Sequence, residues 1–292
     1  MIITVASGKG GTGKTTVATN LALSLLGAGD GTHRGSRLVF ADCDVEEPNA
    51  ALFLRPLLSE KEAVSLLIPA VDTESCTYCG RCAEVCQFHA IAVVGQKVLV
   101  FDELCHGCGS CALECPENAI EESPQAIGHV EQGRVGSMVF CHGEMNIGVP
   151  MATPIIRQVK HIALEHCAED TVILDAPPGT SCPVVETLRG SDYALMVTEP
   201  TPFGLHDLAL AIEVARDVLG IPVGVVINRE GVGDDSIDAY CREHQIPILM
   251  RIPLDRRIAE AYSDGIPIVS ALPEYQERFV ALYDQIMEEC AR

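Results

Sequence analysis

Residues 2–27 read IITVASGKGGTGKTTVATNLALSLLG, and this stretch decides the fold. Its first five residues are apolar or β-branched and predict a buried parallel strand. From Thr15 onward the pattern predicts a helix that ends near Gly27 to Gly29. Between them lies GKGGTGKT at residues 8–15, which has the form G-x4-G-K-T of a phosphate-binding P-loop. A strand, a P-loop and a helix in this order predict an α/β nucleotide-binding fold.

The loop suits phosphate because its glycines let successive backbone amides point at phosphate oxygens at the N-terminus of a helix. Lys14 reaches the outer phosphates, and the Thr15 hydroxyl is a ligand for Mg²⁺. We therefore expect ATP or ADP to be bound by the following residues: Gly8, Gly10, Gly11, Thr12, Gly13, Lys14, Thr15 and Thr16.

Eight of the 14 cysteines form two blocks with the same spacing, C-x2-C-x2-C-x3-C, at residues 76–86 and 105–115. The residues around the blocks also repeat, so the segment is an internal duplication. This spacing is that of bacterial ferredoxins, in which three cysteines of one block and the fourth of the other hold each [4Fe-4S] cluster. The rule predicts Cys76, Cys79, Cys82 and Cys115 for cluster 1, and Cys105, Cys108, Cys111 and Cys86 for cluster 2.

A zinc site is the alternative, but zinc favours paired Cys-x2-Cys knuckles separated by a longer loop. The other six cysteines have no mutual ligand spacing, and we expect most of them to be small buried hydrophobic residues. They are Cys43, Cys141, Cys167, Cys182, Cys241 and Cys290. For Cys290, core packing is expected because it shares a face of the predicted C-terminal helix with Phe279 and Ile286.

The chain has 292 residues and a formal net charge of −21, from 41 Asp and Glu against 20 Lys and Arg. Such a charge argues against nucleic acid or an anionic bilayer as a partner. No run approaches the roughly 18 apolar residues of a membrane helix, and the N-terminus has no signal-peptide pattern. We expect a cytoplasmic protein that binds neither nucleic acid nor membrane.

Polar residues follow three further predicted strands. Strand 37–41 is followed by Asp42 and Asp44, strand 171–174 by Asp175, and strand 223–227 by Asn228 and Arg229. The carboxyl ends of parallel strands share one edge of a sheet with the P-loop, where phosphoryl transfer needs its carboxylates.

The sequence KGGTGKTT at residues 9–16 resembles the deviant Walker A motif of the MinD/ParA, Mrp and nitrogenase iron-protein superfamily. The resemblance implies an ATP-sandwich homodimer in which Lys9 reaches the partner's nucleotide. It gives Lys9, Lys14 and Asp44 catalytic roles, Asp44 orienting the attacking water. It implies that Mg²⁺ is held by Thr15, Asp42 and Asp175, and that the base is bound by Asn228, Arg229, Pro253, Leu254 and Asp255.

The whole chain resembles MinD-superfamily ATPases that contain an inserted two-cluster ferredoxin domain. The resemblance predicts an α/β fold with a doubly wound, mostly parallel sheet in residues 1–70 and 125–292. The insertion, a small α+β ferredoxin domain, is expected at residues 71–124, after a helical stretch at residues 63–68. A strand at residues 135–140 and a helix at residues 155–167 should follow it.

The leading functional hypothesis is an ATPase with slow, partner-stimulated hydrolysis, whose nucleotide state gates electron transfer through two [4Fe-4S] clusters to a partner protein. One alternative is an Mrp-like carrier of iron-sulfur or other metal clusters. Another is a regulator that binds a partner in one nucleotide state. For a carrier, Cys182 is of interest because it lies seven residues after Asp175. In the nitrogenase iron protein, a ligand of the cluster between the subunits has the same offset from the corresponding aspartate. Cys141 is the candidate second ligand.

Iron analysis of Cys182→Ala protein tests the bridging cluster. If Cys182 only packs against its neighbours, the variant keeps about eight iron atoms per chain, the content of two [4Fe-4S] clusters. A loss of iron in the variant would support the bridge.

Overall fold

The computed structural model describes residues 1–27, 37–165 and 171–291. Its centre is a nine-stranded sheet in the order β11-β10-β9-β1-β8-β2-β7-β6-β3. The parallel strands are β1 (Ile2–Ala6), β2 (Leu38–Asp42), β7 (Met138–Met145), β8 (Thr171–Asp175), β9 (Tyr193–Thr198), β10 (Val223–Glu230) and β11 (Ile248–Pro253). Two antiparallel strands, β6 (Ile120–Val135) and β3 (Leu57–Val71), complete one edge.

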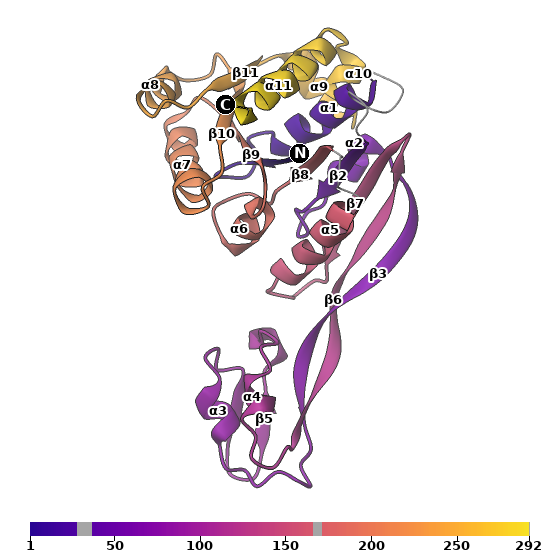
Figure 1. Cartoon of the computed structure of the whole chain (residues 1–292), viewed down its shortest axis with the longest axis vertical. Helices are drawn as coiled ribbons and strands as arrows, with labels where there is room; N and C mark the ends of the chain where they lie inside the picture. Colours follow the sequence, from indigo (N-terminus) through magenta and orange to yellow (C-terminus); the bar gives the residue numbers. More distant parts are fainter. Residues whose placement is uncertain (28–36, 166–170, 292) are drawn as a thin grey trace.

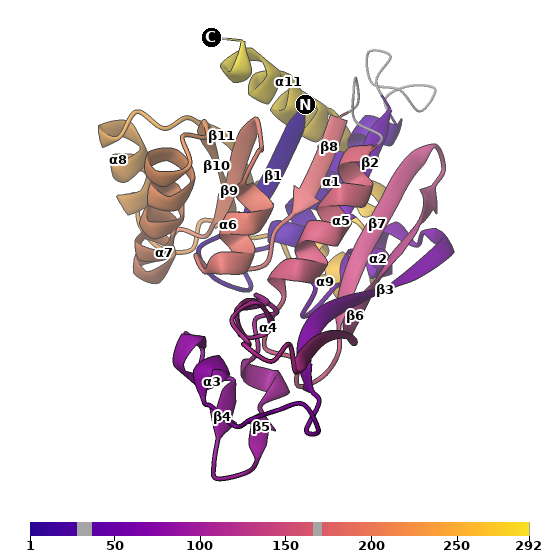
Figure 2. The ribbon, with the colours of Figure 1, turned by 60° about the horizontal axis from the view of Figure 1, so that its bottom comes forward.

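Helices cover both faces of this sheet (Figure 2). One face is packed by α1 (Lys14–Gly27), α2 (Ala50–Leu54), α9 (Arg256–Ser263), α10 (Ile268–Ala271) and α11 (Glu274–Cys290). The other is packed by α5 (Thr153–Glu165), α6 (Cys182–Leu188), α7 (Pro202–Ile212), which continues in π-helical turns to Val218, and α8 (Ser236–Glu243). The prediction of a doubly wound, mostly parallel sheet is confirmed. No described helix is long and apolar enough to cross a membrane.

The strands β3 and β6 extend far beyond the sheet as a two-stranded ribbon (Figure 1). Only residues 128–135 of β6 pair with β7. The predicted helix at residues 63–68 is wrong, because this stretch belongs to β3 and pairs with β6. The periodicity of its apolar residues is compatible with either a helix or a strand. Pairing with a strand that is distant in the sequence makes this segment a strand.

The predicted strand at residues 135–140 is interrupted. Val135 ends β6 and Met138 begins β7, so a two-residue hairpin turn lies inside the predicted strand. Gly136 has a φ of 57°, a conformation that glycine adopts without strain. The predicted helix at residues 155–167 is seen as α5, whose described end is Glu165, so Cys167 lies outside the described residues.

At the far end of the ribbon, residues 72–119 form a small unit that we call the cysteine module. It contains α3 (Arg81–Val85), β4 (Ile91–Val93), β5 (Val98–Val100), a 3-10 turn (Asp102–Leu104) and α4 (Ser110–Leu113). Its small core contains Cys82 and Ile91, which pack against Ile120, the first residue of β6. The predicted insertion at residues 71–124 begins at the last residue of β3 and ends within β6.

The C-terminal helix packs on the sheet through Phe279, Leu282 and Ile286. The prediction that Cys290 packs in the core is wrong, since this residue is exposed. It lies in the last turn of α11, beyond the part of the helix that the sheet covers.

A charged cluster joins β3, β6 and β7 where the ribbon begins. Glu131 accepts hydrogen bonds from His142 Nε2 (3.0 Å) and pairs with Lys61 Nζ (3.0 Å). The contact with His142 and then that with Lys61 lower the pKa of Glu131 below its ordinary value of 4.5. The ionised Glu131 therefore stabilises the folded chain.

We expect Glu131→Gln to lower the free energy of unfolding by about 1 kcal/mol at pH 7. Because the pKa is lower in the folded chain, the unfolded chain binds more protons, and the wild type loses this stability as the pH falls through the folded pKa. The difference between wild type and variant should therefore disappear in acid. Urea unfolding from pH 7 to pH 3 measures it, and the exposed Glu62→Gln on β3 is the matched control. Equal pH profiles for the two variants would contradict the expectation.

Candidate nucleotide and metal-cluster sites

The P-loop surrounds the N-terminus of α1 and places the Lys14 amine among carboxylates. Lys14 Nζ lies 3.0 Å from Asp175 Oδ1 and 3.8 Å from Asp44 Oδ2. Burial alone would lower the pKa of Lys14, but the charges of Asp175 and Asp44 outweigh it and raise that pKa. The ammonium group therefore stays charged although its side chain is almost fully buried.

Asp42 and Asp175 lie opposite each other in the pairing of β2 with β8. Asp42 is fully buried and accepts hydrogen bonds from the backbone N–H groups of Asp44 (3.1 Å) and Ala50 (3.0 Å). Burial, then the charge of Asp175, raises the pKa of Asp42 to about 8. Burial likewise raises the pKa of Asp44 to about 6. The group has more carboxylates than one ammonium can neutralise, so a divalent cation would stabilise their ionised forms.

Two buried polar atoms at this place have no hydrogen-bond partner among the described residues. They are Asp175 Oδ2 and Thr12 Oγ1. Buried polar groups are seldom left unpaired, so these atoms fit a site that binds a ligand. With Thr15 at the start of α1, this donor set of carboxylates and hydroxyls suits Mg²⁺ and phosphate.

Lys9 contacts Glu199 of its own chain. Glu199 also pairs with Arg229, whose Nη1 lies 2.9 Å from its Oε2. The contact with Lys9 is the largest cause that lowers the pKa of Glu199. No role for Glu199 was predicted from the sequence, although this residue lies directly after β9, at the same edge of the sheet as the P-loop.

A pocket beside the P-loop gathers the residues predicted to bind the base. It is lined by Gly11, Gly13, Thr16, Asn228, Arg229, Pro253, Leu254, Asp255, Ile258, Ala259 and Tyr262. The Asn228 amide already donates to the Thr12 carbonyl (2.8 Å) and accepts from the Arg229 N–H (2.9 Å). Its second amide hydrogen and second lone pair are what a base could use. Tyr262 was not predicted to line this pocket, since no motif in the sequence around it indicates a binding residue.

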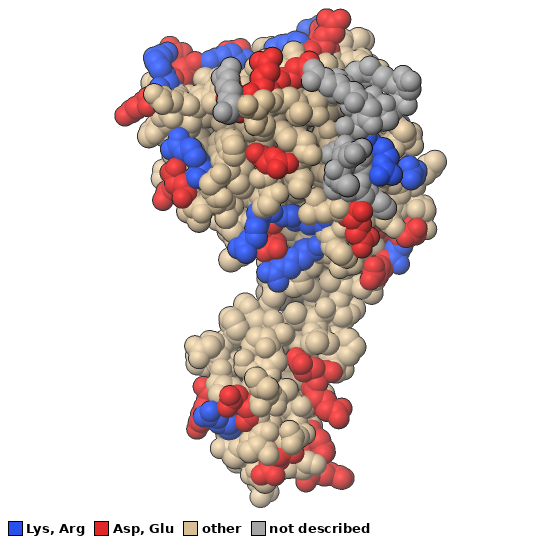
Figure 3. All heavy atoms as spheres, viewed as in Figure 1, with Lys and Arg blue, Asp and Glu red and all other residues tan. Residues whose placement is uncertain are grey.

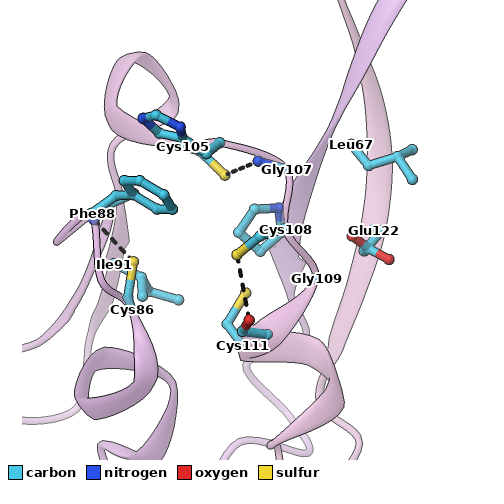
Figure 4. Close-up of a pocket in the computed structure, with 14 residues that line it drawn as sticks. Leu67, Cys86, Phe88, Ile91, Cys105, Gly107, Cys108, Gly109, Cys111 and Glu122 are labelled. Atoms are coloured by element: carbon cyan, nitrogen blue, oxygen red, sulfur yellow. Dashed lines mark hydrogen bonds between the residues drawn. The ribbon is translucent and has the colours of Figure 1, made fainter. Parts of the chain in front are cut away.

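In the cysteine module, each predicted ligand set surrounds one cavity. Cys86, Cys105, Cys108 and Cys111 line the first cavity together with Leu67 and Pro69 of β3 (Figure 4). The second cavity is lined by Cys76, Cys79, Cys82 and Cys115, with Val71 and Ile120 at the end of the ribbon. The first cavity therefore lies nearer to the sheet. No three His, Cys, Asp or Glu side chains in the described ranges are placed to hold a single metal ion.

Backbone amides donate to the sulfur atoms in the same pattern around both cavities. Gly107 N lies 3.4 Å from Cys105 Sγ, and Ala90 N lies 3.3 Å from Cys86 Sγ. At the duplicated positions, the corresponding bonds run from Tyr78 to Cys76 and from Ala119 to Cys115. Amides that donate to sulfur stabilise thiolate ligands and tune an iron-sulfur cluster. Four thiols around a cavity, two of which accept from backbone amides, fit a [4Fe-4S] cluster.

The two cavities differ at their rims. His106 stacks on Phe88 beside the first cavity, with ring centroids 3.6 Å apart. The positions that correspond to them in the duplication are Thr77 and Glu117. His106 is exposed, and the stack gives its ring an aromatic partner.

The remaining cysteines divide by burial. Cys43, Cys141 and Cys241 are buried, as expected, whereas Cys182 is exposed at the start of α6. Cys141 lies in β7 with no exposed surface, so the idea that it joins Cys182 in a cluster between two subunits is wrong for this structure.

The sheet order, the P-loop between β1 and α1 and the carboxylates at the ends of β2 and β8 define a P-loop nucleotide-binding protein. A family model described as the CobQ/CobB/MinD/ParA nucleotide binding domain matches residues 3–268. The chain belongs to this family.

The chain is 32% identical over 267 residues to an uncharacterized protein of Methanocaldococcus jannaschii, covering 91% of this chain and 90% of that protein. It is 24% identical over 288 residues to an iron-sulfur cluster carrier protein of Synechocystis, covering 94% of this chain and 65% of that protein. Among solved structures, MinD of Pyrococcus horikoshii in complex with Mg-ADP has a TM-score of 0.59 at 19% identity, covering 98% of this chain and 95% of that one. The structural likeness shows the fold alone.

The contacts of Glu199 generate a prediction about nucleotide affinity. Glu199→Gln removes a negative charge from Lys9 and Arg229, so the positive potential near the P-loop rises. We expect Mg-ADP to bind roughly three to ten times more tightly at low salt, and the gain to shrink at high salt. Calorimetric titration measures it. Glu230→Gln, which removes a partner of Arg251 instead, is the control. Unchanged or weaker binding by Glu199→Gln would refute the expectation.

Proposed function

We propose that the chain is a Mg²⁺-dependent ATPase that holds two [4Fe-4S] clusters in an inserted ferredoxin domain at residues 71–124. The nucleotide state of a homodimer then gates electron transfer from these clusters to a partner protein. The observation that supports this most directly is the pair of four-thiol cavities on a ribbon whose root, at Val64 and Ile127, packs in one hydrophobic cluster with Val45, the residue after Asp44. When bound, such clusters supply one-electron redox chemistry.

In this proposal the P-loop amides and Lys14 bind the phosphates, and Lys14 exchanges its carboxylate partners for phosphate oxygens. Thr15, Asp42 and Asp175 would hold Mg²⁺, and the ion would supply positive charge against the phosphates. Asp44 orients the attacking water. For Lys9 to act on the nucleotide of a second subunit, its contact with Glu199 has to break.

The four cysteines of each cavity would hold one cluster, and two sulfur atoms in each set accept from the backbone amides of Ala90, Gly107, Tyr78 and Ala119. The module is acidic on its surface, where Asp and Glu outnumber Arg81 and Lys97 (Figure 3). A partner with a basic docking surface suits this charge, because complementary charge speeds encounter and selects the partner.

A second candidate is an ATP-dependent carrier that passes clusters to other proteins. Relatives named iron-sulfur cluster carrier proteins favour it. The complete set of four protein thiols around each cavity favours resident clusters instead, since such a framework releases a cluster less readily.

Redox titration followed by anaerobic EPR tests the proposal. The iron-loaded protein is measured without nucleotide, with ADP and with a nonhydrolysable ATP analogue. We expect the reduction potential to shift by several tens of millivolts between nucleotide states, where about 59 mV corresponds to a tenfold change for one electron. Identical reduction potentials in all nucleotide states, with no nucleotide-dependent oxidation of the clusters by a partner, would refute the proposal that nucleotide gates electron transfer.

Iron analysis separates the two candidates. An electron-transfer protein keeps about eight iron atoms per chain through repeated ATP turnover while its oxidation state changes. A carrier loses iron and sulfide to an acceptor protein that lacks clusters, and does so only when ATP is present. The carrier is then the better description.

The position of Asp44 beside Lys14 generates a prediction about hydrolysis. We expect Asp44→Asn to lower the ATPase rate at least roughly a hundredfold, because the water loses its orienting carboxylate. Nucleotide affinity should change less than about threefold. Steady-state phosphate release and calorimetry give the two quantities, with the exposed Glu46→Gln as the control from the same loop. An equal loss in both variants would argue against a specific role of Asp44.

A further inference from the structure

We infer that Asn146 is a positioning residue that ties the loop after β2 to the point where the ribbon leaves the sheet. Through it, a movement of Asp44 changes the direction of the ribbon and so the place of the cysteine module. This inference rests on the proposed function, for which it supplies a mechanical route.

The ribbon has an irregular point at its root. Val64 pairs with Gly128 and Ser65 pairs with Ala126, so Ile127 is an extra residue on β6. The pairing of β6 with β7 ends at the same place, where Gly128 lies opposite Met145. A β-bulge bends and twists the strand that contains it. The bulge therefore determines the direction in which the ribbon leaves the sheet.

Asn146 holds this bulge by two hydrogen bonds. Its backbone N–H donates to the carbonyl of Ile127 (2.9 Å), and its side-chain Nδ2 donates to the carbonyl of Ala126 (3.1 Å). One residue thus fixes two successive peptide groups at the bend. From Ile120 to Ala126, the strand β6 pairs with β3 and not with β7.

The residue before Asn146 connects the bulge to the nucleotide site. Met145 N–H donates to the carbonyl of Val45 (2.9 Å), and Val45 directly follows Asp44. Val45 is buried in one hydrophobic cluster with Val64, which borders the irregular pairing, and with Ile127, the extra residue of the bulge. A packed core transmits a shift because it has little free volume to absorb it.

The start of this route is the carboxylate that the nucleotide would disturb. Asp44 Oδ2 lies 3.8 Å from Lys14 Nζ, and the Asp44 N–H is held by Asp42. When Lys14 turns to a phosphate, Asp44 loses a charge partner and its loop can take a second position. Val45 then moves together with this loop, and its contacts with Met145 and with Ile127 of the bulge shift as well.

Hydrogen–deuterium exchange of the full, iron-loaded chain under anaerobic conditions tests the inference. The peptides of interest cover residues 62–68 and 122–128, and β9 serves as an internal reference. In wild type we expect the exchange rates at the ribbon root to differ at least threefold between ADP and a nonhydrolysable ATP analogue. The variants Asn146→Asp and Asn146→Ala both lose the side-chain donor, and they should lose more than half of this difference.

The neighbouring exposed Ile147→Ala is the matched control and should keep the whole difference. Nucleotide affinity should stay within twofold of wild type in all three variants, which shows that the site itself is intact. A full nucleotide-dependent difference in both Asn146 variants overturns the inference, and so does a wild-type root whose exchange is the same in both states.

Reduction potentials measured on the same samples separate this inference from the proposed function. If the exchange at the root responds to nucleotide and the potentials and partner oxidation do not, the inference stands and the gating of electrons fails. If the potentials respond and the root does not, the proposed function stands and the role of Asn146 is refuted.

Discussion

Three carboxylates share one buried ammonium group at the carboxyl edge of the sheet, and the other parts of the site follow from this imbalance. Asp42 and Asp175 face each other because β2 and β8 pair in parallel, and Asp44 follows two residues later. Lys14 pairs with Asp175 and Asp44 at once, and burial raises the pKa values of Asp42 and Asp44. A site in this condition gains stability from any ligand that brings a divalent cation.

The same edge of the sheet holds a second balance of charge. Glu199 pairs with both Lys9 and Arg229, so each of these two basic residues has an acidic partner within the chain. An incoming phosphate competes with carboxylates for Lys14, while Lys9 stays with Glu199 until another negative group replaces it. The two lysines of the loop are therefore restrained by different acids, and they can respond to different events.

The sequence predicted the elements whose signals are local. The P-loop needs its glycines and Lys14 within eight residues, and each cysteine block lies within eleven, so spacing alone identified both. The doubly wound, mostly parallel sheet followed from the family resemblance, whereas the strand order and the face that each helix covers came only from the structure. The ribbon could not be predicted, because β3 becomes a strand only by pairing with residues about sixty positions away. For the same reason Glu199, Tyr262 and Asn146 were not found, since their roles come from contacts and not from neighbours in the sequence.

The duplication left its two halves under unequal constraints. Gly107 and Tyr78 occupy matching positions and have nearly the same φ, 59° and 58°. A Cβ on Gly107 would lie 2.7 Å from Leu66 of the ribbon. In the half that touches the ribbon, any side chain at residue 107 would have to displace Leu66, whereas the outer half holds an aromatic residue at the matching position in a strained conformation. The packing of the ribbon thus makes the two halves of the duplicated segment sterically unequal at corresponding positions.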